Sequence, residues 1–236
     1  MLSKFRINRA ALFLGVLSLL TLPREVWGQK RVFAKVEPNA DALNSSAEVY
    51  NAATGGFSNT PGSLATAREA ETANLLPNGM VLLAGGFNGG YLGTAELFDP
   101  STGAFRAPAG AMVTARSSHR AVLLQNGKVL VAGGFNGNFL SAAELYDYST
   151  QVFTSTGAMT AARESFSATV LASGKALIAG GFNGSYLQSA EIYDTVAGTF
   201  AATGSMMTAR EGHSATLVPG SMDMEISSMR GGSKVE

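Results

Sequence analysis

Residues 128–147 read KVLVAGGFNGNFLSAAELYD, and two other stretches of the chain repeat this pattern. They are MVLLAGGFNGGYLGTAELFD at residues 80–99 and KALIAGGFNGSYLQSAEIYD at residues 175–194. The last five residues of the pattern, AELYD at 143–147, have a further counterpart before these stretches, AEVYN at 47–51, and the four copies are spaced by 48, 48 and 47 residues. The four copies begin at Ala47, Ala95, Ala143 and Ala190. A period of this length indicates one supersecondary unit that recurs along the chain.

Within one period the pattern is that of four short β-strands. Two apolar runs, at 121–125 and 128–132, are separated by an Asn-Gly turn, which is typical of a tight hairpin. In this period we expect strands at about 116–124, 128–132, 142–146 and 152–155. The second strand is apolar on both faces, which suits a sheet packed between two neighbours. Four-stranded antiparallel units stacked around an axis form a β-propeller.

The repeat resembles the kelch motif. The resemblance rests on the run from Arg116 to His119, the strand that follows it, Gly133-Gly134, and the strand Ala143–Asp147. It extends over nearly all of residues 45–218 and implies an all-β, kelch-type propeller like the central domain of galactose oxidase. Secreted bacterial kelch-repeat proteins are the type of protein that the chain resembles.

Two features of the kelch motif can be compared with this chain directly. In the family, the double glycine ends the second strand, where close backbone approach excludes side chains. The outer strand of the family usually carries a tryptophan, and here phenylalanine takes its place. These phenylalanines are Phe57, Phe105, Phe153 and Phe200.

The repeat count predicts about four blades, three of them complete. The fourth is expected to be divided between the two ends, with outer strands near 47–58 and an inner strand near 213–218. An incomplete ring, open to dimerisation through its exposed sheet edges, is the alternative. After Val218 the pattern is lost, because Ser227-Ser228 stands where the spacing predicts Gly-Gly. The alternation of Met222, Met224 and Ile226 predicts a poor replacement strand there.

The first 28 residues have the three-part pattern of a signal peptide. Basic residues at positions 4, 6 and 9 precede an apolar run at 10–22, which is too short to span a membrane as a helix. We expect cleavage after Gly28 and a secreted or periplasmic product without a membrane span. The expected organisation is therefore a signal peptide at 1–28, a leader at 29–44, the propeller at 45–220 and a divergent tail at 221–236.

The composition excludes several classes of function. The chain has 17 basic and 17 acidic residues, and this balance argues against nucleic acid as a partner. It has no cysteine and two histidines, His119 and His213, so thiolate chemistry, disulfides and a histidine-based metal centre are not expected. We expect no cofactor and no metal.

Polar and aromatic residues that recur in phase with the repeat are the candidate ligand-binding residues. An arginine enters each inner strand, on the face through which kelch proteins commonly bind partners. The arginines are Arg68, Arg116, Arg163 and Arg210. The loop after each double glycine adds an amide and an aromatic ring. These residues are Asn88, Asn136, Asn183, Tyr91, Phe139 and Tyr186. Such a rim would suit an acidic peptide or a sugar.

The alternative for the arginines, which we favour, is a structural role in which each pairs with a recurrent glutamate or with loop carbonyls and locks one blade to the next. Every repeat also carries a glutamate, and a buried charge requires a partner. The glutamates are Glu48, Glu96, Glu144 and Glu191. The binding hypothesis therefore competes with a purely structural role at these positions.

Three functions remain open from the sequence. The first is an exported, non-enzymatic binding module for a protein or a glycan. The second is a carbohydrate-active enzyme such as a mutarotase, since the loop carboxylates Glu69, Glu164 and Glu211 are candidate acid–base groups. The oxidase chemistry of other kelch propellers needs a cysteine-linked tyrosine, which a chain without cysteine cannot form. The third is a truncated propeller without independent activity.

Overall fold

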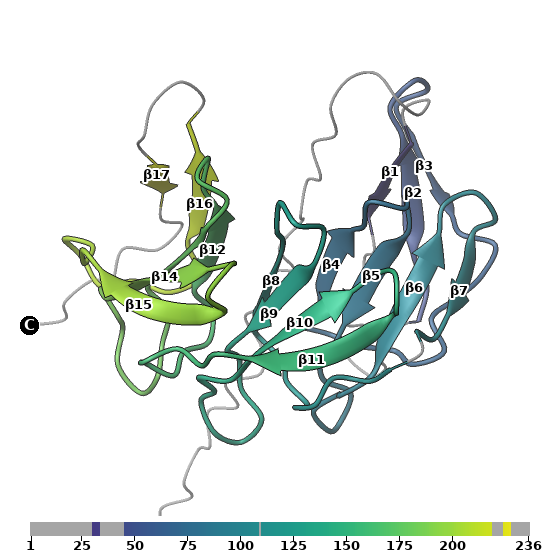
Figure 1. Ribbon diagram of the computed structural model, residues 1–236. Helices are drawn as coiled ribbons and strands as arrows, with labels where there is room; N and C mark the ends of the chain where they lie inside the picture. Colours follow the sequence, from purple (N-terminus) through teal and green to yellow (C-terminus); the bar gives the residue numbers. More distant parts are fainter. Residues whose placement is uncertain (1–29, 34–44, 109, 219–223, 228–236) are drawn as a thin grey trace, which may run out of the picture.

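The computed structural model describes residues 30–33, 45–108, 110–218 and 224–227. The predicted signal peptide and most of the predicted leader and tail lie outside the described residues. Within them the chain is all-β, and three four-stranded antiparallel sheets follow one another in chain order. A partial sheet lies at each end of the series (Figure 1). The all-β, propeller-type architecture with about four blades is thus confirmed.

The three complete sheets, or blades, have the same composition of strands. Each begins with an inner strand and continues outward through three more strands joined in sequence order. The first is β4 (Thr72–Leu75), β5 (Val81–Ala84), β6 (Ala95–Asp99) and β7 (Ala104–Arg106). The second is β8 (Arg120–Leu123), β9 (Val129–Ala132), β10 (Ala143–Asp147) and β11 (Val152–Thr156). The third is β12 (Ser167–Val170), β13 (Ala176–Ala179), β14 (Ala190–Asp194) and β15 (Thr199–Thr203).

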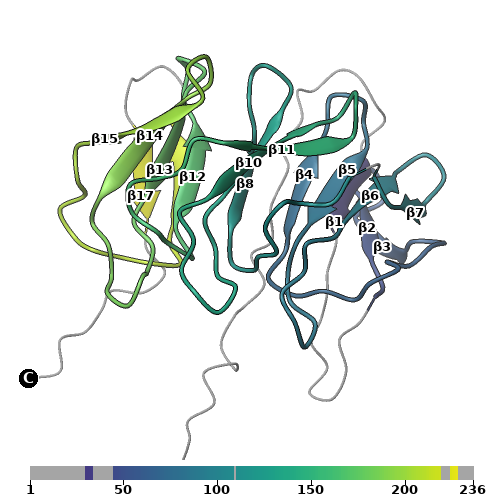
Figure 2. The ribbon, with the colours of Figure 1, turned by 60° about the horizontal axis from the view of Figure 1, so that its bottom comes forward.

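The partial sheets contain the strands that were expected to share the fourth blade. At one end β1 (Lys30–Phe33), β2 (Glu48–Asn51) and β3 (Gly56–Asn59) form a three-stranded sheet. At the other end β16 (Ser214–Leu217) pairs with β17 (Met224–Ser227), in the segment where alternation predicted a replacement strand. The divided blade is therefore present as two separate sheets, which lie at opposite ends of an arc in Figure 1, and Figure 2 shows β17 and β1–β3 on opposite sides of the molecule.

The core lies between successive blades. Strands β5 and β9 are buried along their whole length, as expected for sheets covered on both faces. One cluster joins Leu82 and Leu97 to Val129 and Val131 of the next blade. In the three complete blades the phenylalanines that replace the family tryptophan, Phe105, Phe153 and Phe200, join this packing, and the Phe153 ring centroid lies 4.7 Å from that of the buried Tyr146. Apolar burial between blades is the main stabilising term for such a stack.

The double glycines end the second strands for a steric reason. Gly134 has a φ of 98°, and a Cβ at this position would lie 2.5 Å from the Ser117 carbonyl oxygen of the same blade. A side chain is therefore excluded here by backbone conformation and by space together. This confirms the close backbone approach that the motif predicted.

The inner strands begin later than the sequence suggested. The strand expected from Arg116 starts at Arg120, because Ser118 adopts a left-handed conformation with a φ of 53°. Ala70, Ser165 and Gly212 occupy the same repeat position and are also left-handed. Their backbones form what we call the inner ladder, in which each N–H donates to the carbonyl of the equivalent residue in the preceding blade. The bonds are Ser118 to Ala70 at 3.0 Å, Ser165 to Ser118 at 3.1 Å and Gly212 to Ser165 at 2.7 Å.

Candidate functional site

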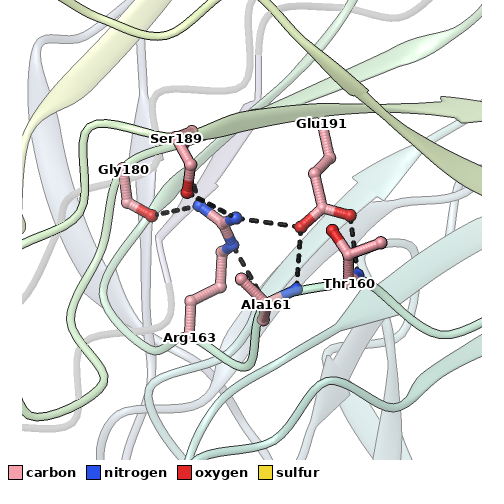
Figure 3. Close-up of polar contacts among 6 residues, drawn as sticks. All are labelled: Thr160, Ala161, Arg163, Gly180, Ser189 and Glu191. Carbon is pink, nitrogen blue, oxygen red and sulfur yellow. Dashed lines mark hydrogen bonds and ion pairs between the residues drawn. The ribbon is translucent and has the colours of Figure 1, made fainter.

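The recurrent arginines are buried inside the blades. Arg163 donates to the carbonyls of Gly180 and Ser189, at 2.7 and 3.0 Å, and to the Glu191 carboxylate at 2.9 Å (Figure 3). Glu191 in turn accepts backbone N–H bonds from Thr160 and Ala161, at 2.8 and 3.2 Å. The network ties the loop that enters the blade to the third strand, β14.

The same network is built in all three complete blades. Arg68 pairs with Glu96 at 2.8 Å and Arg116 pairs with Glu144 at 2.7 Å. All three arginines, Arg163 included, are 0% exposed. Each pairs with the glutamate 28 residues further along the chain, on the third strand of its own blade, which confirms the predicted pairing but places it within a blade instead of between blades. A guanidinium buried in this way has no free surface for a ligand, and removal of either partner would leave an uncompensated buried charge.

The electrostatics agree with this structural role. Burial lowers the pKa of Arg116 and Arg163, and the paired glutamates oppose this shift. Burial alone would raise the pKa of Glu191, but the hydrogen bonds from Thr160, Ala161 and Arg163 outweigh it, so that its pKa is lowered. The charged form of Glu191 is therefore favoured opposite the Arg163 guanidinium.

Arg210 differs from the other three arginines. It enters β16 and is only half-buried, and among the described residues its side chain makes one hydrogen bond, from Nε to the Thr208 carbonyl at 3.4 Å. Glu48, the first of the recurrent glutamates, lies on β2 and is also half-buried. Neither side chain takes part in an ion pair within the described part of the chain.

Six aromatic rings form a continuous row across the three complete blades, which we call the aromatic row. It consists of Phe87, Tyr91, Phe135, Phe139, Phe182 and Tyr186. Each ring contacts the next at centroid distances of 5.2–5.7 Å, alternately within a blade and between blades. The loops after the second strands thus bring side chains about 45 residues apart into one surface.

The aromatic row is partly open to solvent. Tyr186 is 56% exposed, while Tyr91 and Phe139 are half-buried. Three of its rings were not singled out from the sequence, although the repeated Ala-Gly-Gly-Phe-Asn-Gly segment contains them. The three are Phe87, Phe135 and Phe182. Each is held by a pair of backbone hydrogen bonds to the loop that enters the inner strand, so the row has a fixed backbone support.

Free amides accompany the row. Asn88 and Asn183 are exposed and Asn136 is half-buried. In the described part of the molecule none of the three amide side chains forms a hydrogen bond, so each offers a donor and an acceptor to a ligand. Of the sequence candidates, then, the amides and rings share one surface and three of the four arginines are withdrawn from it.

Three titratable groups next to residues of the inner ladder have shifted pKa values. Glu164 is bonded through its backbone to Phe182, and burial together with the negative charge of Glu211 raises its pKa to about 7. His119 and His213 are buried, and burial lowers their pKa values to about 3 and about 4. His119 bonds to Thr72 of the preceding blade through Nε2 at 2.9 Å, a packing role.

Neither a metal site nor a membrane span was found in the part of the chain that the structure describes. No cluster there contains three or more side chains able to ligate a metal. Nor is any helix in those residues long and apolar enough to cross a bilayer.

Comparison with known families supports the kelch resemblance. A model of the kelch motif matches residues 116–160, which include all of the second blade, β8–β11. The match and the four-stranded antiparallel blades fit a kelch-repeat protein, and the fold is a kelch-type propeller of about four blades. Comparison with curated proteins gave no match.

Proposed function

We propose that this protein is an exported, non-enzymatic binding module that holds a carbohydrate chain on the aromatic row. The observation that carries the proposal is the row itself, an uncharged, partly exposed line of rings with a free amide in each blade. Kelch repeats commonly mediate interactions, and the signal-peptide pattern at 1–28 supports the proposal of export.

The chemistry of the row favours a sugar over an acidic peptide. An acidic ligand would need exposed guanidinium groups, and the arginines of the complete blades are buried on their glutamates. Ring faces and edges pack against the apolar C–H faces of sugars, while amides pair with hydroxyl groups that both donate and accept. One ring pair and one amide per blade repeat along the row, so a ligand built of repeating units can use equivalent contacts.

The experiment measures oligosaccharide binding and its dependence on the row. The probe is a panel of soluble neutral oligosaccharides, titrated calorimetrically against the wild type and against Tyr91→Ala, Phe139→Ala and Tyr186→Ala. We expect each substitution to weaken binding by about 5- to 100-fold, a typical value for an aromatic binding residue. Phe57→Ala is the matched control, because Phe57 is 59% exposed but lies outside the row.

Two outcomes would overturn the proposal. One is binding that survives all three substitutions unchanged, which would place the ligand elsewhere. The other is the absence of binding to every oligosaccharide together with row-dependent capture of a peptide, which would make the ligand a protein.

One observation favours a second candidate, a mutarotase-like activity. Glu164 lies beside the row, and its pKa of about 7 suits proton exchange at neutral pH. Polarimetry of freshly dissolved reducing sugars tests this function. An accelerated approach to anomeric equilibrium that is lost in Glu164→Gln would support it, and a rate equal to the uncatalysed one would exclude it.

A further inference from the structure

The two partial sheets are complementary halves of one blade. In the first of them β1 pairs with β2 so that Arg31 lies opposite Tyr50, just as Val81 lies opposite Phe98 in the first complete blade. Strand β1 therefore occupies the position of a second strand, and its sheet lacks an inner strand. Strand β16 packs beside β12 as an inner strand and lacks the outer pair. Together, β16 and β1–β3 contain the four strands of a blade.

The unpaired charges at the two ends match this complementarity. Arg210 enters β16 as Arg163 enters β12, and Glu48 lies on β2 where Glu191 lies on β14. In every complete blade these two positions form a buried ion pair. At the two ends of the arc, Arg210 and Glu48 are each half-buried and have no ion-pair partner among the described residues.

The inner ladder also has one unused group at each end. Every joint between blades uses the N–H of one left-handed residue and the carbonyl of its equivalent in the preceding blade. Among the described residues this leaves the Ala70 N–H without a ladder acceptor and the Gly212 carbonyl without a ladder donor. A blade made from β16 and β1–β3 would precede the blade of Ala70, so the same joint supplies this missing bond as well.

A second copy of the chain fits these ends better than closure of one copy on itself. The three joints use the same ladder bond, at 2.7–3.1 Å, so they advance from blade to blade by similar steps. After these steps the sheet of β16 and the sheet of β1–β3 still lie at opposite ends of the arc (Figure 1). Two copies joined at both ends would form a ring of about eight blades, within the range of about four to eight known for propellers.

We propose that two copies exchange their ends to form a closed, two-fold symmetric ring. In each of two equivalent joints, β1 of one copy pairs with β16 of the other, Glu48 pairs with the partner's Arg210, and the Ala70 N–H reaches the partner's Gly212 carbonyl. Strand β17 takes the second-strand position on β16, with Ile226 opposite Ala215, so it must leave when the joint forms. The single chain and the ring therefore compete for one edge of β16.

Complementation between two variants tests the proposal. We expect the wild type to have twice the chain mass in sedimentation equilibrium, and Glu48→Ala and Arg210→Ala each to dissociate at least about 100-fold more readily, because each leaves two unpaired buried charges per ring. An equimolar mixture of the two variants should recover the dimer, since one joint is then intact and the other has lost both charges. Such rescue in trans cannot arise from closure within one chain.

Further variants distinguish the joint from general effects on folding. Ile226→Pro weakens β17, so it should strengthen the dimer. Lys128→Ala removes an exposed charge of the middle blade and should leave the mass unchanged, and Tyr91→Ala should do the same because the aromatic row is not part of the joint. Circular dichroism on each variant verifies that the blades are folded. A monomeric wild type would overturn the proposal, and so would a dimer that neither Glu48→Ala nor Arg210→Ala weakens.

Discussion

Replacing Arg116 with methionine tests whether the buried ion pairs hold the blades together. The substitution removes four hydrogen bonds that the guanidinium donates, three of 2.7–2.8 Å to two carbonyls and to Glu144 and one of 3.2 Å from Nε to the Thr114 carbonyl. The Glu144 carboxylate, which is 1% exposed, keeps only the backbone N–H groups of Val113 and Thr114. Loss of one partner from a buried pair costs about 3–5 kcal/mol. For a domain of this size that free energy lowers the melting temperature by about 6–20 °C.

The assay is thermal and urea unfolding followed by circular dichroism. Lys128→Met is the matched control, because the Lys128–Asp147 pair spans 3.4 Å at the surface and should contribute less than about 1 kcal/mol. Adding Glu144→Gln to Arg116→Met removes the orphan charge and keeps an acceptor for the backbone, so about 1–3 kcal/mol should return. Stability of Arg116→Met within about 1 kcal/mol of the wild type would refute the reasoning, and so would a further loss on adding Glu144→Gln.

Three further predictions concern titration and backbone strain. Because the folded pKa values of His119 and His213, about 3 and about 4, lie below the unfolded value of 6.5, the unfolded chain takes up protons first. The free energy of unfolding should then fall as the pH drops from 6.5 toward 4, by up to about 1.4 kcal/mol per pH unit per histidine. In urea titrations at several pH values, His119→Phe and His213→Phe should each show a smaller dependence of stability on pH. The pH dependence that Glu164 contributes to stability has the opposite sign. Its raised pKa of about 7 favours the folded state below pH 4.5, and this contribution is lost as the pH rises through 7. Glu164→Gln should therefore gain stability relative to the wild type between pH 5 and 8 in the same assay. Gly134→Ala should unfold at much lower temperature than Gly137→Ala, because both glycines have a φ near 98° but only the first lacks space for a Cβ, and equal melting temperatures would contradict this.

The repeat motifs allowed most of the fold to be predicted from the sequence. The pentad at Ala143 predicted β10 within one residue, and the Asn-Gly turn placed the hairpin of β8 and β9 correctly. Strand β1 was not predicted, because its segment occurs without the double glycine that marks the other second strands. The late start of β8 was also missed, since a left-handed serine such as Ser118 has no signature in its own residue type.

The candidate site was less accessible to sequence reasoning. Recurrence identified the arginines and the glutamates and favoured their pairing, which the buried pair of Arg116 and Glu144 confirms, but a period does not show that both partners belong to the same blade. The aromatic row depends on contacts between repeats, such as that of Tyr91 with Phe135 at 5.7 Å. Such contacts depend on the rotation and distance that relate one blade to the next, and no sequence pattern within one blade specifies these quantities.

The inner ladder uses only backbone atoms, and this has a consequence for how such a protein can change. The four equivalent positions hold Ala70, Ser118, Ser165 and Gly212, so the joint between blades does not depend on one side chain. A blade that is duplicated, deleted or moved within the gene would bring its own connector and would dock on any neighbour. The number of blades can therefore be altered by recombination in steps of one repeat, while the loops that carry the aromatic rings are free to diversify.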